Sequence, residues 1–82
     1  MTREFTRTGI MNSVHRRPIE SSVLAAVGYD QRRRVLEVEL VSGAVYQYLE
    51  VPAREFMALL AADSSGRHYN VNIKPNYDCR KM

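Results

Sequence analysis

The 82-residue sequence has few of the residues that build catalytic and metal sites. It contains one cysteine, Cys79, and two histidines, His15 and His68. One cysteine cannot form a disulfide within the chain, which excludes a disulfide-stapled secreted fold and favours the reducing cytoplasm. Neither histidine has a Cys, His or carboxylate at ligand spacing on a shared face, so no metal ion is expected. Cys79 lies near the C-terminus without a base or an oxyanion site. We therefore expect neither an enzyme nor a bound cofactor.

Long hydrophobic runs are also missing. No apolar stretch approaches the roughly 20 residues needed to span a bilayer, and the arginines near the N-terminus precede no stretch of the signal-peptide kind. A membrane partner is therefore not expected. Twelve Lys and Arg against nine Asp and Glu give a formal net charge of +3, a mild bias towards anionic partners.

The chain divides into three parts. Residues 1–19 are rich in Thr, Arg, Asn and Ser with apolar residues at no regular spacing, which predicts a flexible N-terminal arm. Residues 20–78 are the expected folded domain, and residues 79–82 are a C-terminal tail. A domain of this size buries only about 60% of its unfolded surface, so a deep active-site pocket is not expected.

Three strands are expected to form an antiparallel meander. Residues 23–29 are a short apolar run with Gly28 as a candidate bulge. Residues 35–40 alternate apolar and acidic side chains, and residues 45–49 form the third strand. The turns between them are Arg32-Arg33-Arg34, the basic tip of a hairpin, and Ser42-Gly43.

Helical segments follow the strands. Pro52 suits the first position of a helix over 52–62. The expected apolar face of this helix consists of Ala53, Phe56, Met57 and Leu60. Asp63, Ser64 and Ser65 can end it and cap a short second segment that contains Tyr69 and Ile73. The expected fold is α+β: a three-stranded antiparallel meander, a helix packed on one face, a short C-terminal helical segment, and a polar, open opposite face.

A set of short motifs in a fixed order resembles the KTSC domain family. They are Ser21-Ser22, Gly28-Tyr29, Leu36-x-Val38, Gly43, Tyr46-Gln47-Tyr48, Val51-Pro52, Ser64-Ser65-Gly66, Tyr69-Asn70 and Ile73, within residues 21–77. This family occurs as a stand-alone bacterial domain and at the C-terminus of some lysyl-tRNA synthetases. The resemblance implies an uncharacterised domain for which RNA binding is suggested by the attachment to a synthetase.

The hairpin loop around Gly43 decides which sheet face Tyr46 and Tyr48 share. A two-residue loop would set the tyrosines on the acidic face, away from the core. A three-residue loop, with Gly43 in the left-handed region, pairs residue 38 with 46 and residue 36 with 48. We favour the three-residue loop, which turns the tyrosines into the core and makes them unsuitable as base-stacking platforms. The outward, solvated residues are then Glu37, Glu39 and Gln47.

Two functions of different classes remain. The first is weak electrostatic RNA binding through basic side chains. The candidate contacts are Arg32, Arg33, Arg34, Arg16, Arg17, Arg67 and Lys74, which could also be solvated surface charges. The second is a protein-interaction module or small homodimer that uses an open sheet edge.

Overall fold

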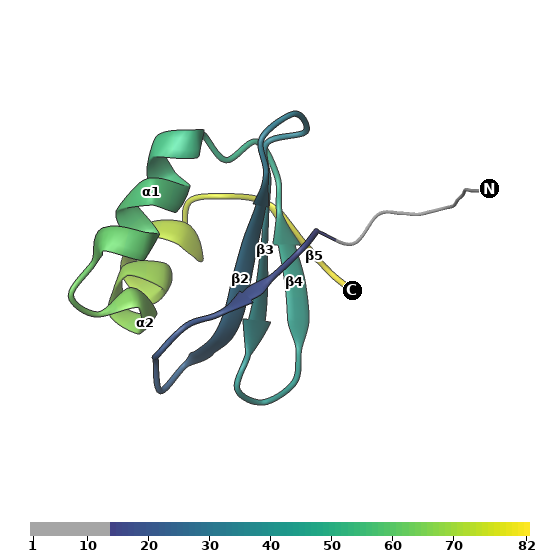
Figure 1. The fold of residues 1–82 in the computed structure, drawn as a ribbon. Helices are drawn as coiled ribbons and strands as arrows, with labels where there is room; N and C mark the ends of the chain where they lie inside the picture. Colours follow the sequence, from purple (N-terminus) through teal and green to yellow (C-terminus); the bar gives the residue numbers. More distant parts are fainter. Residues whose placement is uncertain (1–13) are drawn as a thin grey trace.

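The structure, a computed structural model, describes residues 14–82 as a five-stranded antiparallel sheet with helical segments on one face (Figure 1). The sheet order follows the chain order. The strands are β1 (Arg17–Pro18), β2 (Leu24–Asp30), β3 (Val35–Leu40), β4 (Val45–Tyr48) and β5 (Cys79–Lys81). The helical segments are α1 (Ala53–Ala61), α2 (Ser65–His68) and the π-helix η1 (Tyr69–Ile73). The expected α+β class is confirmed. Within residues 14–82, no helix has the length and apolar character needed to cross a membrane.

The expected three-stranded sheet is wrong, because β1 and β5 extend the meander at its two edges. Arg17 pairs with Val27, and Cys79 pairs with Tyr48. β1 lies inside the predicted arm and β5 inside the predicted tail. Both strands are too short to show the period-two pattern by which strands are recognised. Residues 1–13 of the predicted arm lie outside the described residues.

The central hairpin has the expected register. Leu36 pairs with Tyr48, and Val38 pairs with Tyr46. The Leu40 carbonyl accepts from the Gly43 amide at 2.8 Å, and Gly43 has a φ of 98°. The prediction of a three-residue loop with glycine in the left-handed region is therefore confirmed. The bulge expected at Gly28 lies instead between Leu24 and Ala26.

Helix α1 packs on the sheet with a face rotated from the predicted one. Leu59 is its fully buried residue, and Phe56 and Leu60 pack against the core beside it. Met57, predicted to face inwards, is 62% exposed. Phe56 and Leu60 can share an apolar helix face with either Met57 or Leu59. In the structure the face that contains Leu59 packs on the sheet, and Met57 is therefore in solvent.

The short second helical segment is present and continues as a π-helix. The Ser64 hydroxyl accepts from the Arg67 amide at 3.2 Å, which caps α2. Tyr69 and Ile73 of η1 are both buried. A Cβ at Gly66 would lie 3.1 Å from the Ser21 hydroxyl, so glycine lets α2 approach the loop before β2 closely.

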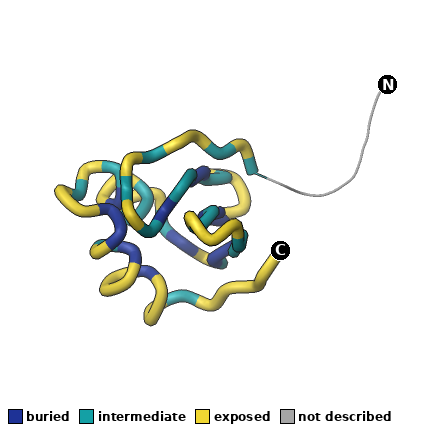
Figure 2. Tube along the Cα trace, turned by 90° about the horizontal axis from the view of Figure 1, so that it is seen from below, coloured by how far each residue is buried: buried dark blue, intermediate teal, exposed yellow. Residues whose placement is uncertain are grey.

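The core lies between the sheet and the helical segments. The fully or almost fully buried apolar residues of the core are Leu24, Val27, Leu36, Val38, Tyr48, Val51, Leu59, Tyr69 and Ile73. Strand β5, at the C-terminus, is exposed (Figure 2). The opposite sheet face was predicted to be open, and this prediction is wrong. Glu37 and Gln47 are each only 1% exposed, because the segment before β1 and the Arg80 side chain reach across them.

Candidate nucleic-acid interface

The three arginines of the β2–β3 hairpin tip are exposed on a turn whose backbone is held at both sides. The Asp30 carboxylate accepts from the Arg32 and Arg33 amides at 3.1 and 3.2 Å. Arg34 has a positive φ of 59°, and its carbonyl accepts from the Val51 amide at 2.9 Å. The tip is thus anchored to the segment that leads into α1, while its side chains project into solvent.

Arg54, which sequence reasoning did not single out, lies in the first turn of α1. Figure 1 shows that α1 begins at the same end of the sheet as the β2–β3 turn. Burial and the hydrogen bond to Glu55 raise the pKa of the Tyr77 phenol, whereas the positive charges of Arg54 and Arg34 oppose that rise. Both guanidinium groups therefore act on the same phenol. We call Arg32, Arg33, Arg34 and Arg54 the basic end. The sequence gives no sign that Arg54 belongs to the basic end, because only folding brings α1 to the hairpin tip.

The other predicted contacts are not gathered at the basic end. Arg16 is bound to Glu37 at 3.2 Å on the sheet face opposite the helices. The Arg17 guanidinium lies over the Phe56 ring, 5.8 Å from its centroid. Arg67 follows Gly66, which packs on the loop before β2, so Arg67 lies at the other end of the sheet. Lys74 is exposed just after η1.

Glu37 is the centre of a buried polar cluster on that opposite face. Its Oε1 accepts from the Gln47 side-chain amide at 2.8 Å and from the Val14 backbone amide at 3.3 Å. The Gln47 Oε1 in turn accepts from Arg80 Nε at 3.2 Å. Together with the Arg16 contact, these bonds fasten both termini of the described chain across β3 and β4. Within the described residues, Arg16 Nη1 is buried without a hydrogen-bond partner and lies 3.7 Å from Glu39. The remaining bonds of the cluster hold the two ends of the described chain on the sheet.

The tyrosines of the family motif lie on the core side of the sheet. Tyr48 is 2% exposed, and its hydroxyl is 2.6 Å from that of Tyr69. The two rings meet edge to face with centroids 5.8 Å apart. Burial raises the pKa of both phenols. Tyr46 is half-buried and packs against the same core. Neither ring is presented as an exposed stacking surface.

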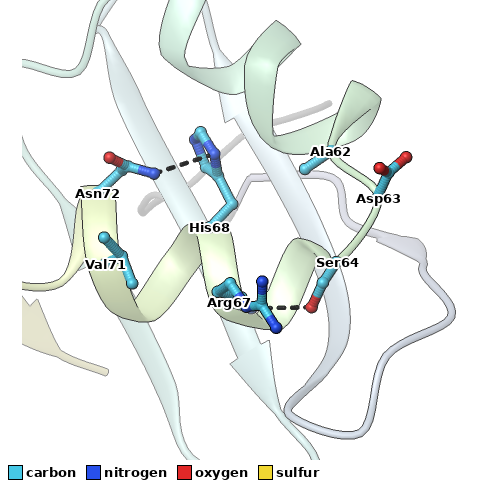
Figure 3. A pocket seen from close by; sticks show the side chains of 7 residues that line it. All are labelled: Ala62, Asp63, Ser64, Arg67, His68, Val71 and Asn72. Atoms are coloured by element: carbon cyan, nitrogen blue, oxygen red, sulfur yellow. Dashed lines mark hydrogen bonds between the residues drawn. The ribbon is translucent and has the colours of Figure 1, made fainter.

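A cavity of about 420 Å³ lies beside α2 and η1 (Figure 3). It is lined by Ala62, Asp63, Ser64, Arg67, His68, Val71 and Asn72. His68 Nε2 is 2.7 Å from the Glu55 carboxylate, and His68 Nδ1 is 3.2 Å from the Asn72 amide. A carboxylate-oriented histidine occurs in catalytic sites, but the hydroxyl of this lining, Ser64, is occupied as the cap of α2. The Glu55–His68 pair joins α1 to α2.

Residues 14–82 contain no group of three or more His, Cys, Asp or Glu side chains that could hold a metal ion. The most distinctive chemistry of the described chain is therefore the exposed positive charge of the basic end.

Comparison with known proteins identifies the domain. The family model of the KTSC domain matches residues 20–77. An uncharacterised protein of Stutzerimonas stutzeri is 49% identical over 59 residues, covering 72% of this chain and 83% of that protein. A Tsukamurella paurometabola protein is 45% identical over 60 residues, covering 73% and 90%.

Two further relatives extend the comparison. A lysine–tRNA ligase of Nostoc punctiforme is 38% identical over 63 residues, which cover 77% of this chain and 11% of the ligase. The crystal structure of a KTSC domain protein from Yersinia pestis superposes with a TM-score of 0.82 and 37% identity, covering 85% of this chain and 99% of that one. The chain belongs to the KTSC domain family.

Proposed function

We propose that this domain is a non-enzymatic module that binds RNA weakly through the basic end. The observation that carries the proposal is the run of three exposed arginines on an anchored turn. Among residues 14–82, no carboxylate lies within ion-pair distance of Arg32, Arg34 or Arg54, and Arg33 is 3.9 Å from Asp30. Unpaired guanidinium groups can bind phosphate oxygens without first breaking an internal ion pair.

A relative that is an RNA-acting enzyme by name supports RNA as the anion that the basic end binds. One relative is a lysine–tRNA ligase, and this chain aligns with about a tenth of it. A small basic domain beside such an enzyme could add non-specific affinity for RNA, because phosphate neutralisation is independent of sequence. Such a role would operate in the cytoplasm.

The protein-interaction alternative has less support. β1 carries Pro18, and β5 is three residues long with Arg80 and Lys81. Short edge strands, proline and positive charge all oppose the addition of another strand. We therefore expect a monomer in size-exclusion chromatography with light scattering. A stable dimer would favour the protein-interaction function over RNA binding.

The salt dependence of binding tests the RNA proposal. About three or four phosphate contacts to single-stranded RNA give a log–log salt slope of about −2 to −3. Replacing Arg32, Arg33 and Arg34 together by Ala should flatten this slope by up to about two units, measured by fluorescence anisotropy of a labelled RNA. The tip contributes little packing, so the variant should keep its fold.

A control removes charge elsewhere. Arg67→Ala with Lys74→Ala takes two exposed cations from the helical segments and should leave the slope within about half a unit of the wild type. Absence of binding at low salt, or equal binding by the triple variant, contradicts the proposal.

A further inference from the structure

A second cavity, of about 290 Å³, lies between the N-terminal segment, β2 and α1. It is lined by His15, Arg17, Val27, Gly28, Tyr29 and Phe56. This volume is just below the roughly 300–1,000 Å³ typical of ligand pockets. A single flat ring system suits such a space better than a large ligand. The lining joins two aromatic rings, an imidazole and a guanidinium group.

The aromatic side of the cavity is fixed in position. The Tyr29 and Phe56 rings are stacked, with centroids 5.2 Å apart and planes at 14° to each other. The Tyr29 hydroxyl donates to the Val51 carbonyl, which sets the plane of its ring. Both rings are half-buried, so each keeps part of its surface for another molecule. Preorganised rings of this kind lose little entropy when a flat ligand stacks on them.

Arg17 is the solvent-exposed partner of these rings. Its side chain is exposed, and its guanidinium lies over Phe56 at 5.8 Å. A nucleobase that enters can replace this contact with ring stacking, and the planar guanidinium can then lie against the base. Lysine could supply the charge but not the flat surface.

The cavity adjoins the basic end where β2 leads into the hairpin tip. Tyr29 precedes Arg32 by three residues, so their Cα atoms are at most about 10 Å apart. Val51 links the two places, because its carbonyl accepts from Tyr29 and its amide donates to the Arg34 carbonyl. RNA whose phosphates meet the arginines of the tip could therefore place a neighbouring base at the cavity.

We infer that this cavity accepts one unpaired nucleobase of a single-stranded RNA held at the basic end. The inference rests on the proposed function and adds to it a preference for single strands, because a base inside a duplex stack cannot present its face to Tyr29 and Phe56. Stacking is tolerant of base identity, so no strong sequence preference is expected.

The experiment compares a labelled single-stranded RNA with an abasic ribose-phosphate oligomer of the same length, by anisotropy at low salt. One stacked base strengthens binding by a factor of roughly 5 to 150, so the RNA should bind at least about 5-fold more tightly than the abasic oligomer. Arg17→Lys and Phe56→Leu should each reduce that advantage at least 3-fold. Arg67→Lys, at the other end of the sheet, is the matched control and should leave it unchanged.

The outcomes separate the two claims. If neither oligomer binds, the proposed function fails and this inference fails with it. If both bind equally well, the basic end binds phosphate and the base site is overturned. An RNA advantage that survives in both variants also overturns it, since the base is then held elsewhere. Circular dichroism checks that Phe56→Leu is folded, and Arg17→Lys on the surface decides the matter if it is not.

Discussion

The sheet face under the helices and the face opposite them are filled by different chemistry. Under the helices, apolar residues of the strands meet Leu59 of α1 and Ile73 of η1. On the opposite face, a carboxylate, an amide and two arginines occupy the centre. Figure 2 shows that burial extends through the central strands. A polar strand face is therefore not the same as an exposed one.

The two faces also differ in what holds them closed. The helix face closes by burial of apolar area, contributed by several elements at once. The opposite face closes by directed bonds from a short segment, with Gly28 lying directly beneath the His15 carbonyl. We expect damage to the first face to unfold the domain, and damage to the second to release the segment before β2 while the core persists.

Leu59→Ala should have the largest effect. This residue is fully buried, and removal of a buried leucine side chain costs about 2–5 kcal/mol of unfolding free energy. Denaturant unfolding measures the loss. Met57→Ala, two positions away on the same helix but 62% exposed, is the control and should change stability by no more than about 0.5 kcal/mol. Equal losses of stability in the two variants would show that α1 packs on the sheet through a different face.

High pH should destabilise the domain, mainly through the two buried tyrosines of the helix face. Burial raises the pKa of Tyr48 and Tyr69 above the ordinary value of 10, so the folded state binds more protons than the unfolded state above that pH. Stability is thus fully present below about pH 10 and falls as pH rises further, by up to about 1.4 kcal/mol per pH unit for each tyrosine. Denaturant unfolding from pH 8 to 11 tests this.

The control for this pH dependence is the double variant Tyr48→Phe with Tyr69→Phe. It removes both titrating groups together and leaves neither hydroxyl without its partner. Its stability should fall much less steeply above pH 10. A wild-type slope no steeper than that of the double variant would mean that these phenols ionise as readily in the folded state as in the unfolded state.

Gly28→Ala should act on the opposite face. A Cβ at this position would overlap the His15 carbonyl oxygen, so the segment before β2 must move away. Overpacking of this kind costs about 1–3 kcal/mol. We expect fast hydrogen exchange at the Ile19 amide, which donates to Ala25 at 3.2 Å, with the protection of β3 retained. Unchanged protection at Ile19 would show that the segment tolerates a Cβ beneath it.

The sequence predicted the parts of the molecule that repeat a pattern. Alternation in residues 35–40 and the demand of Gly43 for a left-handed turn fixed the central hairpin and its register. Neither signal exists for β1, two residues that include Pro18. Gly28 suggests a bulge in the sequence, because its role as a point of close approach depends on a segment whose placement has no sequence signal. Arg54 was missed for the same reason, since only tertiary structure brings it to the hairpin tip.

Glu37→Gln should have the smallest effect and tests whether charge or shape holds the opposite face. The amide oxygen can still accept from Gln47 and Val14, which donate to Oε1. The new amide nitrogen would then face the Arg16 guanidinium, so that two hydrogen-bond donors meet. The 3.2 Å ion pair between Arg16 and residue 37 is lost. Loss of a charge-assisted hydrogen bond costs about 1–2 kcal/mol, measured by denaturant unfolding. Glu39→Gln is the matched control, because Glu39 is 3.7 Å from Arg16 and 37% exposed, and should change stability by less than about 0.5 kcal/mol. If the two variants are equally stable, hydrogen-bonded shape alone keeps this face closed, and the arginine contributes no charge-specific stability.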